Sequence, residues 1–599
     1  MKDFFKTFFA ALAGVLIGLF LISMISMMML GGVVGSISTT PTYTLKDKTI
    51  LKLDLNGLLS DREGDSPLNS LMGTKSIGID NIVEAIQKAK ENDKIKGIYI
   101  RCAHLTSGVA SLEPIRKALI DFKDSQKFIV AYADSYSQPT YYLASVADKV
   151  ILNPKGSFDF QGMSRQVQFQ RGMYEKMGVK YQVFKVGTFK SAVEPYIQDQ
   201  MSEANREQTI SYLNDAWSYF LTNISESRNI PVEKLNEYAD KYLGFYEADS
   251  ILQFGMVDTL MYISEVDKYL KDLTETEEKE KLRLTSVKNM QGIDAKEKDS
   301  KDKIAILYAE GTIVPDDYSS NLISGSTITA KQYVKELQSL KNDEDVKAVV
   351  FRVNSGGGSA YVSEQIWHAV SELKKVKPVV VSMGDYAASG GYYISCAATS
   401  IVAEPTTLTG SIGIFGLIPE GEELAKKMGV SFDEVKTNKH SGLGNNVFGI
   451  PFVISAYSKA FTEEESQMLQ KYIESGYDLF ITRCAEGRSM SKDSIDAIGQ
   501  GRVWTGSQAL AIGLVDKLGG IDDAVKIAAE AAELEDYALK SYPEKTNLIT
   551  ELLNTAMGGT KIQALQLLVG EDKYKEQLYR KVLETTEINI AEMPERILF

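Results

Sequence analysis

The sequence predicts an α/β protein of two tandem repeats that follow one N-terminal transmembrane helix. Residues from about 92 to 190 match residues 343 to 441 at a constant offset of 251, which indicates two copies of one fold. Short apolar runs alternate with helix-length segments in both copies, as expected of α/β units with buried strands. A stretch of 28 residues near the N-terminus carries no charge. At 599 residues the chain exceeds the size of a single core and suits two domains.

The uncharged stretch runs from Phe8 to Gly35 and is long enough to cross a bilayer, which takes about 20 apolar residues. A cleaved signal peptide has an apolar region of only about 7–15 residues, so the length favours an uncleaved anchor. Small residues at 35–38 leave cleavage as an alternative. Lys2 and Lys6 precede the stretch and favour a cytoplasmic N-terminus. We therefore expect residues 1–36 to anchor the chain once in the cytoplasmic membrane, with the body on its outer side.

The two repeats are expected at residues 45–272 and 303–540. Each opens on a short apolar run that ends at a glycine, at residues 48–57 and 303–311. Further strands are expected at Ile98–Arg101, Phe128–Ala133 and Val150–Leu152, and at residues 349–352, 379–383 and 401–403. Helices are expected between the strands, for example at Leu112–Phe122 and Ser363–Lys375.

The match between the copies resumes further along the chain after a small insertion in the second copy. Tyr212 faces Tyr472 at an offset of 260, and Gly255 faces Gly513 at an offset of 258. Residues 273–302 are dense in Glu, Lys and Asp, which predicts a solvated, partly helical linker between the repeats. In the tail, residues 541–599, the segments 548–557 and 562–568 suggest short packing or assembly helices.

Composition argues against several classes of function. The net charge of −14 gives no reason to expect a nucleic-acid partner. The three cysteines cannot form a disulfide framework and show no metal-binding spacing. The three histidines, His104, His368 and His440, show no zinc-type spacing either, and no phosphate-loop motif is present. We expect no metal and no cofactor.

The two copies differ at positions where one of them has a side chain that could take part in catalysis. Ser389 lies among small residues in Ala-Ala-Ser-Gly-Gly, whereas the first copy has Gln138 at that position. Lys190 lies in Gly-Thr-Phe-Lys-Ser of the first copy, whereas the second has Ser441. One copy keeps a candidate nucleophile and the other a candidate base. The sequence therefore predicts one active site shared between two halves.

Glycines beside Ser389 predict a site for an oxyanion. Gly390 offers an unencumbered amide, and residues 356–358 are three glycines between a strand end and a helix, where exposed amides bind anions. Paired amides near a nucleophile are what acyl transfer needs. The first copy has Thr106 and Ser107 opposite the last two of these glycines. The copy that lacks the serine therefore lacks the glycines as well.

A lysine can take the proton of a serine hydroxyl if burial leaves part of its amine neutral. Lys190 lies in a stretch without an acidic residue until Glu194. Ser411, which faces Phe160 of the first copy, would supply a hydroxyl that orients the amine. A serine–histidine pair with His440, one residue before the position that faces Lys190, is the alternative base arrangement.

Four motifs resemble the long, two-repeat form of the signal peptide peptidase A family, in order and over nearly the whole chain. They are Gly-Thr-Phe-Lys190-Ser-Ala-Val-Glu-Pro, Arg-Val-Asn-Ser-Gly-Gly-Gly, Ala-Ala-Ser389-Gly-Gly-Tyr-Tyr-Ile-Ser and Thr-Leu-Thr-Gly-Ser411. One departure is Gly356, where the family commonly has proline.

The resemblance implies a serine–lysine dyad of Ser389 and Lys190, with Ser411 assisting the lysine and Gly358 and Gly390 as oxyanion donors. It also implies a ClpP/crotonase-like fold and a dome-shaped homotetramer around an enclosed chamber. The implied activity is hydrolysis of remnant signal peptides and other short apolar peptides on the periplasmic side of the membrane, without ATP.

Two rival functions come from other classes. An acyl-CoA enzyme of the crotonase type shares the implied fold, but the anchor and the serine–lysine pair argue against it; coenzyme A binding would identify it. A non-catalytic membrane scaffold assembled through the repeats would leave Ser389 and Lys190 dispensable.

Overall fold

The computed structural model describes residues 44–63, 76–293, 300–316, 326–443, 447–450, 454–544 and 590–592. The predicted transmembrane segment lies outside the described residues, as do the segments 548–557 and 562–568, for which the sequence suggests helices. Within the described ranges, no helix has both the length and the apolar composition needed to span a membrane.

The first repeat is a largely parallel sheet with helices on both faces. Its main strands follow the spatial order β2-β1-β3-β4-β5-β7. Their bounds are β1 Thr49–Ser60, β2 Ser76–Gly78, β3 Ile95–Thr106, β4 Phe128–Tyr136, β5 Lys149–Phe158 and β7 Thr259–Leu260. The helices α3 (Ile79–Glu91), α4 (Glu113–Phe122) and α5 (Gln138–Ala144) cover one face and α11 (Ile263–Leu273) covers the other. Parallel strands joined by helices are buried on both faces, as the apolar runs predict.

The second repeat has the same plan, with spatial order β20-β16-β14-β12-β9-β22 and β15 beside β14. The strands are β9 Lys303–Glu310, β12 Val346–Ser355, β14 Val379–Ala388, β15 Ser400–Ala403, β16 Leu408–Gly410, β20 Val503–Thr505 and β22 Ala538–Tyr542. The helices α13 (Ala330–Asn342), α14 (Ala360–Lys374) and α15 (Gly390–Ser395) cover one face and α20 (Ile521–Ala531) covers the other. The strands and helices that the repeat pattern predicts are thus confirmed in both copies.

Part of the segment expected to be a solvated linker belongs to the first sheet instead. Strand β8 (Leu284–Ser286) pairs in parallel with β1, and α12 (Val287–Gln291) follows it. Thr285 and Met290 are buried there. Helix α12 fits the expectation of a partly helical linker, whereas β8, in which Thr285 alone is buried, belongs to the first sheet.

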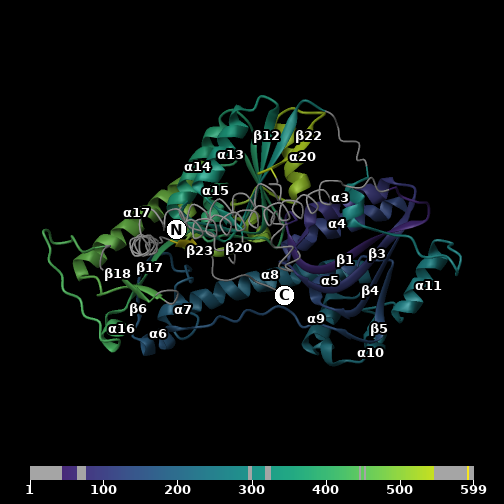
Figure 1. Cartoon of the computed structure of the whole chain (residues 1–599), viewed down its shortest axis with the longest axis horizontal. Coiled ribbons are helices and arrows are strands. Elements are labelled where there is room, and N and C mark those ends of the chain that lie inside the picture. Colours follow the sequence, from purple (N-terminus) through teal and green to yellow (C-terminus); the bar gives the residue numbers. More distant parts are fainter. Residues whose placement is uncertain are drawn as a thin grey trace, which may run out of the picture.

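The first repeat reaches across to the second through its residues 171–228. Strand β6 (Lys180–Val186) pairs antiparallel with β17 (Ile414–Glu420) of the second repeat, and the long helix α8 (Glu203–Arg228) returns. Figure 1 shows β6 and the short helices α6 (Arg171–Met177) and α7 (Glu194–Ile197), coloured blue, beside the green elements of the second repeat. We call the surface between the two repeats the repeat junction.

Candidate active site

Ser389 occupies a sharp turn at the repeat junction. It is the single residue between the end of β14 and the start of α15, with φ 55° and ψ −116°. A residue other than glycine in such a conformation costs about 1–3 kcal/mol and persists only where its surroundings impose it. The position that faces it, Gln138, is the first residue of α5 and follows Ser137 in ordinary extended geometry. The strained turn therefore occurs in the copy that carries the serine.

Lys190 reaches Ser389 from the loop that follows β6. Its Nζ donates hydrogen bonds to Ser389 Oγ at 2.8 Å, to Ser411 Oγ at 3.1 Å and to the Ser411 carbonyl oxygen at 3.2 Å. All three residues are buried. The structure thus brings together a lysine of one repeat and two serines of the other, which the sequence singled out separately.

Residues that the sequence did not single out hold the lysine loop. Phe189 N donates to the Gln500 carbonyl oxygen at 2.8 Å, and Gln208 Nε2 on α8 donates to the Phe189 carbonyl oxygen at 3.0 Å. At Gly501, φ is +77° and a Cβ would lie 2.6 Å from Lys190 N. Only glycine leaves room for the lysine backbone at this point.

The backbone around Ser389 fixes which amides remain available. Ser389 N donates to the Gly410 carbonyl oxygen at 2.8 Å, so this amide already has an acceptor. Ser411, with φ 49°, follows Gly410 directly, and its own N–H donates to the Arg502 carbonyl oxygen at 2.7 Å. These bonds tie the turn at Ser389 to the serine that contacts Lys190.

The two glycines predicted as oxyanion donors lie next to each other. A Cβ on Gly390 would be 3.1 Å from Gly358 N and 2.8 Å from Ser363 Oγ. Gly358 has φ +151°, and a Cβ there would collide with the Ile313 carbonyl oxygen at 1.9 Å. Gly390 is the first residue of α15, where an N–H has no acceptor within the helix.

The strand that contains Gly358 also pairs with an extended segment of the chain's own C-terminal region. Strand β13 (Gly357–Ser359) pairs antiparallel with β23 (Ile590–Glu592), and Gly358 is opposite Ala591. A backbone in extended conformation can therefore lie along the strand that contains Gly358.

In the first repeat, the positions that correspond to Ser389 and Ser411 carry Gln138 and Phe160, whose side chains contact the surrounding fold. Gln138 Oε1 accepts hydrogen bonds from Gln161 N at 2.6 Å and Gly162 N at 2.8 Å. Phe160, which faces Ser411, is buried against the rings of Tyr141 and Trp217. The first repeat thus retains the fold around this place but not its chemistry.

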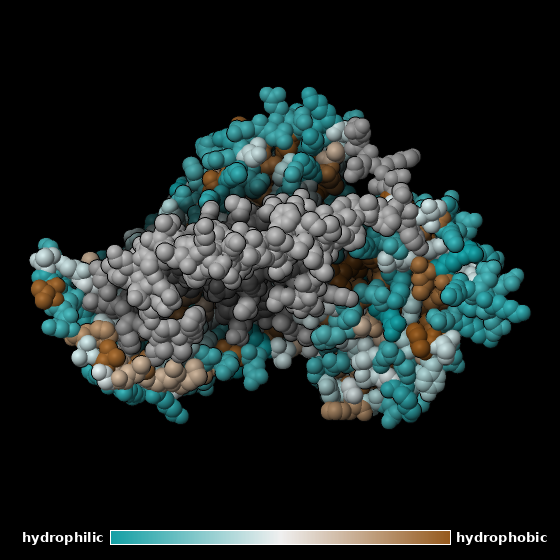
Figure 2. All heavy atoms as spheres, in the orientation of Figure 1, coloured by the Kyte–Doolittle hydropathy of each residue, from teal (hydrophilic) through white to brown (hydrophobic). Residues whose placement is uncertain are grey.

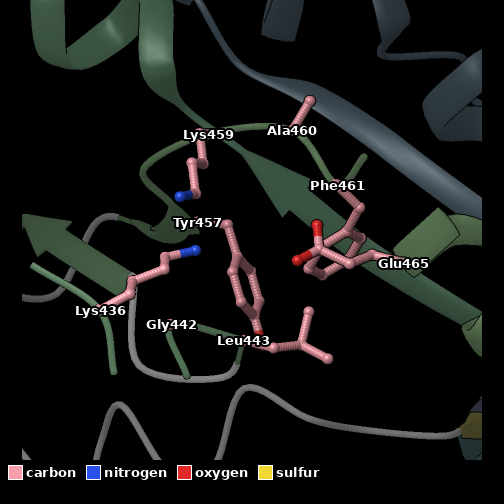
Figure 3. Close-up of a pocket in the computed structure, with 8 residues that line it drawn as sticks. All are labelled: Lys436, Gly442, Leu443, Tyr457, Lys459, Ala460, Phe461 and Glu465. Atoms are coloured by element: carbon pink, nitrogen blue, oxygen red, sulfur yellow. The ribbon is translucent and has the colours of Figure 1, made fainter. Parts of the chain in front are cut away.

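The histidine alternative receives no support from the geometry. His440 Nδ1 lies 3.3 Å from Glu465 Oε1 at the start of α17 (Glu463–Arg488), whereas Ser389 Oγ is bonded to Lys190. Glu465 also lines a pocket in the second repeat. Figure 3 shows the ring of Tyr457 crossing that pocket, with Lys436 and Lys459 on one side and Glu465 on the other. This pocket contains none of the predicted site residues.

The chain resembles known proteins over both repeats. The model of peptidase family S49 matches residues 121–277 and 371–535. The chain is 36% identical over 530 residues to Protease 4 of Salmonella typhi, across 85% of this chain and 83% of that protein. It is 32% identical over 250 residues to a putative signal peptide peptidase SppA of Enterococcus faecium, across 41% of this chain and 69% of that protein.

Among solved structures, a mutant of ClpP1 from Listeria monocytogenes matches with a TM-score of 0.23 and 16% identity. It covers 38% of this chain and 95% of the ClpP1 chain. The predicted ClpP/crotonase-like fold of the repeats stays a prediction at this level of similarity.

Proposed function

The chain belongs to peptidase family S49 and is a serine protease, and from this we propose that Ser389 is its nucleophile and Lys190 its general base. The observation that carries the proposal is the 2.8 Å contact between Lys190 Nζ and Ser389 Oγ, two buried groups that lie 199 positions apart. A nucleophile and a base within hydrogen-bond reach are the signature of covalent catalysis by serine.

The proposed reaction starts with a neutral Lys190 amine, a form that burial favours over the charged one. The amine accepts the proton of Ser389 Oγ as the oxygen attacks the carbonyl carbon of the peptide bond. The resulting ammonium then donates that proton to the departing amine, which leaves an acyl ester on Ser389. A water molecule, deprotonated by the same lysine, hydrolyses the ester. Ser411 Oγ, 3.1 Å from Lys190 Nζ, keeps the amine directed at Ser389 throughout.

We propose the N–H groups of Gly358 and Gly390 as the donors that stabilise the negative charge on the carbonyl oxygen. The proximity of the two glycines supports this role, and so does the commitment of Ser389 N to Gly410. Two amides held in place before the reaction stabilise charge without reorganising, and one such donor is worth about 3–4 kcal/mol in the transition state.

We propose that the substrates are short apolar peptides, including remnant signal peptides, bound in extended conformation along β13. The antiparallel pairing of β13 with β23 supports this mode of binding, because it places an extended backbone along β13, and a substrate would take the place of β23 there. Strand addition reads mainly the backbone of the peptide, which suits an enzyme that degrades many sequences. The relative from Enterococcus faecium, which is named putative signal peptide peptidase SppA, supports this substrate class.

The proposal is tested with purified protein and a synthetic signal peptide. We expect Ser389→Ala and Lys190→Ala each to lower kcat by roughly three orders of magnitude or more, because members of one catalytic unit fail together. Lys190→Arg should not restore activity, since a guanidinium stays protonated. Unchanged thermal unfolding would show that each variant is folded, and wild-type turnover in Ser389→Ala would refute the nucleophile assignment.

A lysine base also predicts a pH dependence. Activity should rise from acid towards mildly alkaline pH as the amine loses its proton, because a base works near its own pKa. A profile that stays flat from about pH 5 to 9 would contradict a lysine base.

We further propose that residues 1–36 anchor the chain in the cytoplasmic membrane, with the repeats on the periplasmic side as a homotetramer. The uncharged segment from Phe8 to Gly35 supports the anchor. Replacing residues 1–36 with a cleavable secretion signal should yield a soluble enzyme that still hydrolyses the peptide, because the proposed chemistry lies within the repeats. A folded but inactive product would show that the anchor does more than tether.

A further inference from the structure

A buried glutamine of the first repeat lies in the repeat junction. Glutamine is mostly a surface residue, and Figure 2 shows hydrophilic residues over most of the described surface in view. Gln208 on α8 is an exception, because it is only 2% exposed. A polar side chain buried to this degree needs hydrogen-bond partners, so its partners indicate which parts of the molecule it holds together.

Gln208 binds the loop that carries Lys190 and a strand of the second repeat at the same time. Its Nε2 donates hydrogen bonds to the Phe189 carbonyl oxygen at 3.0 Å and to Ser191 Oγ at 3.1 Å. Its Oε1 accepts a hydrogen bond from Val503 N at 3.1 Å. Phe189 and Ser191 are the two neighbours of Lys190 in the sequence. The side chain of Gln208 therefore holds the chain on both sides of the lysine.

The contact with Val503 connects Gln208 to the strand pair beside Ser389. Val503 is the first residue of β20 and lies opposite Gly410 in the antiparallel pair of β20 with β16. The Gly410 carbonyl oxygen accepts the hydrogen bond from Ser389 N, and Gly410 directly precedes Ser411. One amide group thus links the backbone beside the proposed base to the strand pair that holds the proposed nucleophile.

Other buried polar groups fix the conformation of Gln208. Its Nε2 lies 3.4 Å from Asn205 Oδ1, and Asn205 Nδ2 donates to Glu194 Oε2 at 2.8 Å. Ser202 Oγ, at the start of α8, donates to the other oxygen of the Glu194 carboxylate at 2.6 Å. Asn205 and Glu194 are both buried. Because each member of this network has partners of its own, the network holds Gln208 in one orientation.

The second repeat has a different residue at the corresponding position. At the offset of 260, Gln208 faces Met468, which has no group that could form these hydrogen bonds and is 47% exposed. The second repeat also lacks the lysine, because Ser441 faces Lys190. The buried glutamine and the lysine therefore occur together in the same copy.

We infer that Gln208 is a positioning residue for Lys190. The inference rests on the proposed function, because it concerns the approach of the lysine amine to Ser389. By binding the backbone beside the lysine and strand β20 together, Gln208 fixes the lysine loop of the first repeat against the second repeat. This keeps Lys190 Nζ and Ser389 Oγ 2.8 Å apart, within the reach that proton transfer needs. Gln208 acts through the backbone and not on the reacting atoms.

The test measures kcat and KM of the purified full chain on the synthetic signal peptide. Gln208→Met keeps the length of the side chain and removes its hydrogen bonds. We expect kcat to fall by about 10-fold to 100-fold, because a displaced base is less effective in every turnover. KM should change by less than about threefold, because no group that binds the substrate is altered.

The matched control is Gln508→Met, which removes a bridge between the same two elements. Gln508 Nε2 donates to Ser211 Oγ on α8 at 3.1 Å, and its Oε1 accepts a hydrogen bond from Thr505 N on β20 at 3.2 Å. Neither contact involves the lysine loop. Gln508→Met should therefore keep the wild-type kcat, and thermal unfolding of both variants shows what each substitution costs in stability.

A double-mutant cycle separates a role through Lys190 from a general loss of structure. It combines Gln208→Met with Lys190→Ala and uses a 4-nitrophenyl ester of a short apolar peptide. The leaving group of this ester departs without a proton, which keeps the residual rate of Lys190→Ala measurable. Gln208→Met should lower the rate in the wild-type background and leave it unchanged in the Lys190→Ala background. Gln208→Asn, which is one methylene shorter, is measured in the same way and keeps a polar side chain in the buried site.

Wild-type kcat in Gln208→Met or Gln208→Asn would overturn the inference. An equal loss of kcat in Gln508→Met, or a further loss in the Lys190→Ala background, would overturn it as well. In each of these cases the proposed function stands as long as Ser389→Ala and Lys190→Ala do not hydrolyse the signal peptide. Wild-type hydrolysis by Ser389→Ala or Lys190→Ala would refute the proposed function and the inference with it.

Discussion

At the scale of single residues, the proposed site depends on glycines that leave space as much as on Lys190 and Ser389. Lys190 is buried because Gly501 allows the second repeat to approach its backbone, and a Cβ at Gly501 would also lie 2.7 Å from Lys190 Cβ. Moving a reacting group by about 1 Å can cost 100-fold in rate, so this contact controls the distance from Lys190 Nζ to Ser389 Oγ.

Gly501→Ala should therefore lower kcat by about 100-fold. The matched control is Gly429→Ala, because Gly429 has φ +75°, close to the +77° of Gly501, and no atom within 4 Å of its Cβ position. Both variants bear the cost of a side chain at positive φ, and Gly501→Ala also bears the cost of its close contacts with Lys190. The melting temperature should therefore fall further in Gly501→Ala, and only this variant should lose activity. Equal activity of the two variants in the peptide assay would argue against this role of Gly501.

The sequence could single out Ser389, Lys190 and Ser411 as candidates because the two copies differ at each of them within a constant register. Gly501 also differs between the copies, since it faces Leu243 at the offset of 258. Its role was missed because it depends on a positive φ and on contact with a loop of the other repeat. Neither property follows from residue spacing.

At the scale of elements, buried polar groups fix how the repeats meet. The Asp385 carboxylate on β14 accepts hydrogen bonds from Ser111 N at 2.9 Å and from Ser111 Oγ at 2.5 Å. Burial raises the pKa of the Glu404 carboxyl to about 7, and the nearby Lys117 ammonium opposes this shift. Separating the partners of a buried pair leaves a buried polar group unsatisfied, which is unfavourable. These contacts therefore specify one arrangement of the repeats.

The raised pKa of Glu404 predicts that stability falls as pH rises. Its carboxyl has a pKa of 4.5 as the reference value and about 7 when folded, so the folded protein binds more protons between these values. The stabilising contribution is complete below pH 4.5 and is lost as pH rises through 7. Over this range it amounts to about 3 kcal/mol at most, since one pKa unit corresponds to 1.36 kcal/mol.

Chemical denaturation at pH 5 and pH 8 measures this contribution. The wild type should lose more free energy of unfolding between the two pH values than Glu404→Gln, which cannot ionise at this position. The same loss in both proteins would mean that Glu404 does not titrate as described.

The pattern of strands and helices could be predicted because each copy repeats the other and the strands are continuous apolar runs. The pairing of β6 with β17 could not be predicted, because β6 belongs to the first repeat and β17 to the second. Strand β8 escaped prediction for another reason: it has three residues in a charged segment, too few to show a period.

At the scale of the whole molecule, the proposed site arises from two copies that are each incomplete. The first repeat supplies Lys190 and the second supplies Ser389, Ser411 and the two glycines. The structure places Lys190 Nζ and Ser389 Oγ of a single chain 2.8 Å apart. A tandem arrangement keeps the two halves at a high effective concentration, so neither needs a group that the other provides.

The most direct test of this account is the peptidase activity of mixed oligomers that contain Lys190→Ala and Ser389→Ala chains. The two chains are co-expressed with different affinity tags and isolated through both tags in succession. Mixed oligomers of wild-type chains and chains with both substitutions serve as the positive control and should retain activity in proportion to their wild-type content. If Lys190 and Ser389 of the same chain form the site, the first mixture should show no activity beyond that of either variant alone. Every site would then lack either the lysine or the serine. Recovered hydrolysis of the signal peptide would mean that lysine and serine of different chains form the site, and it would contradict the account.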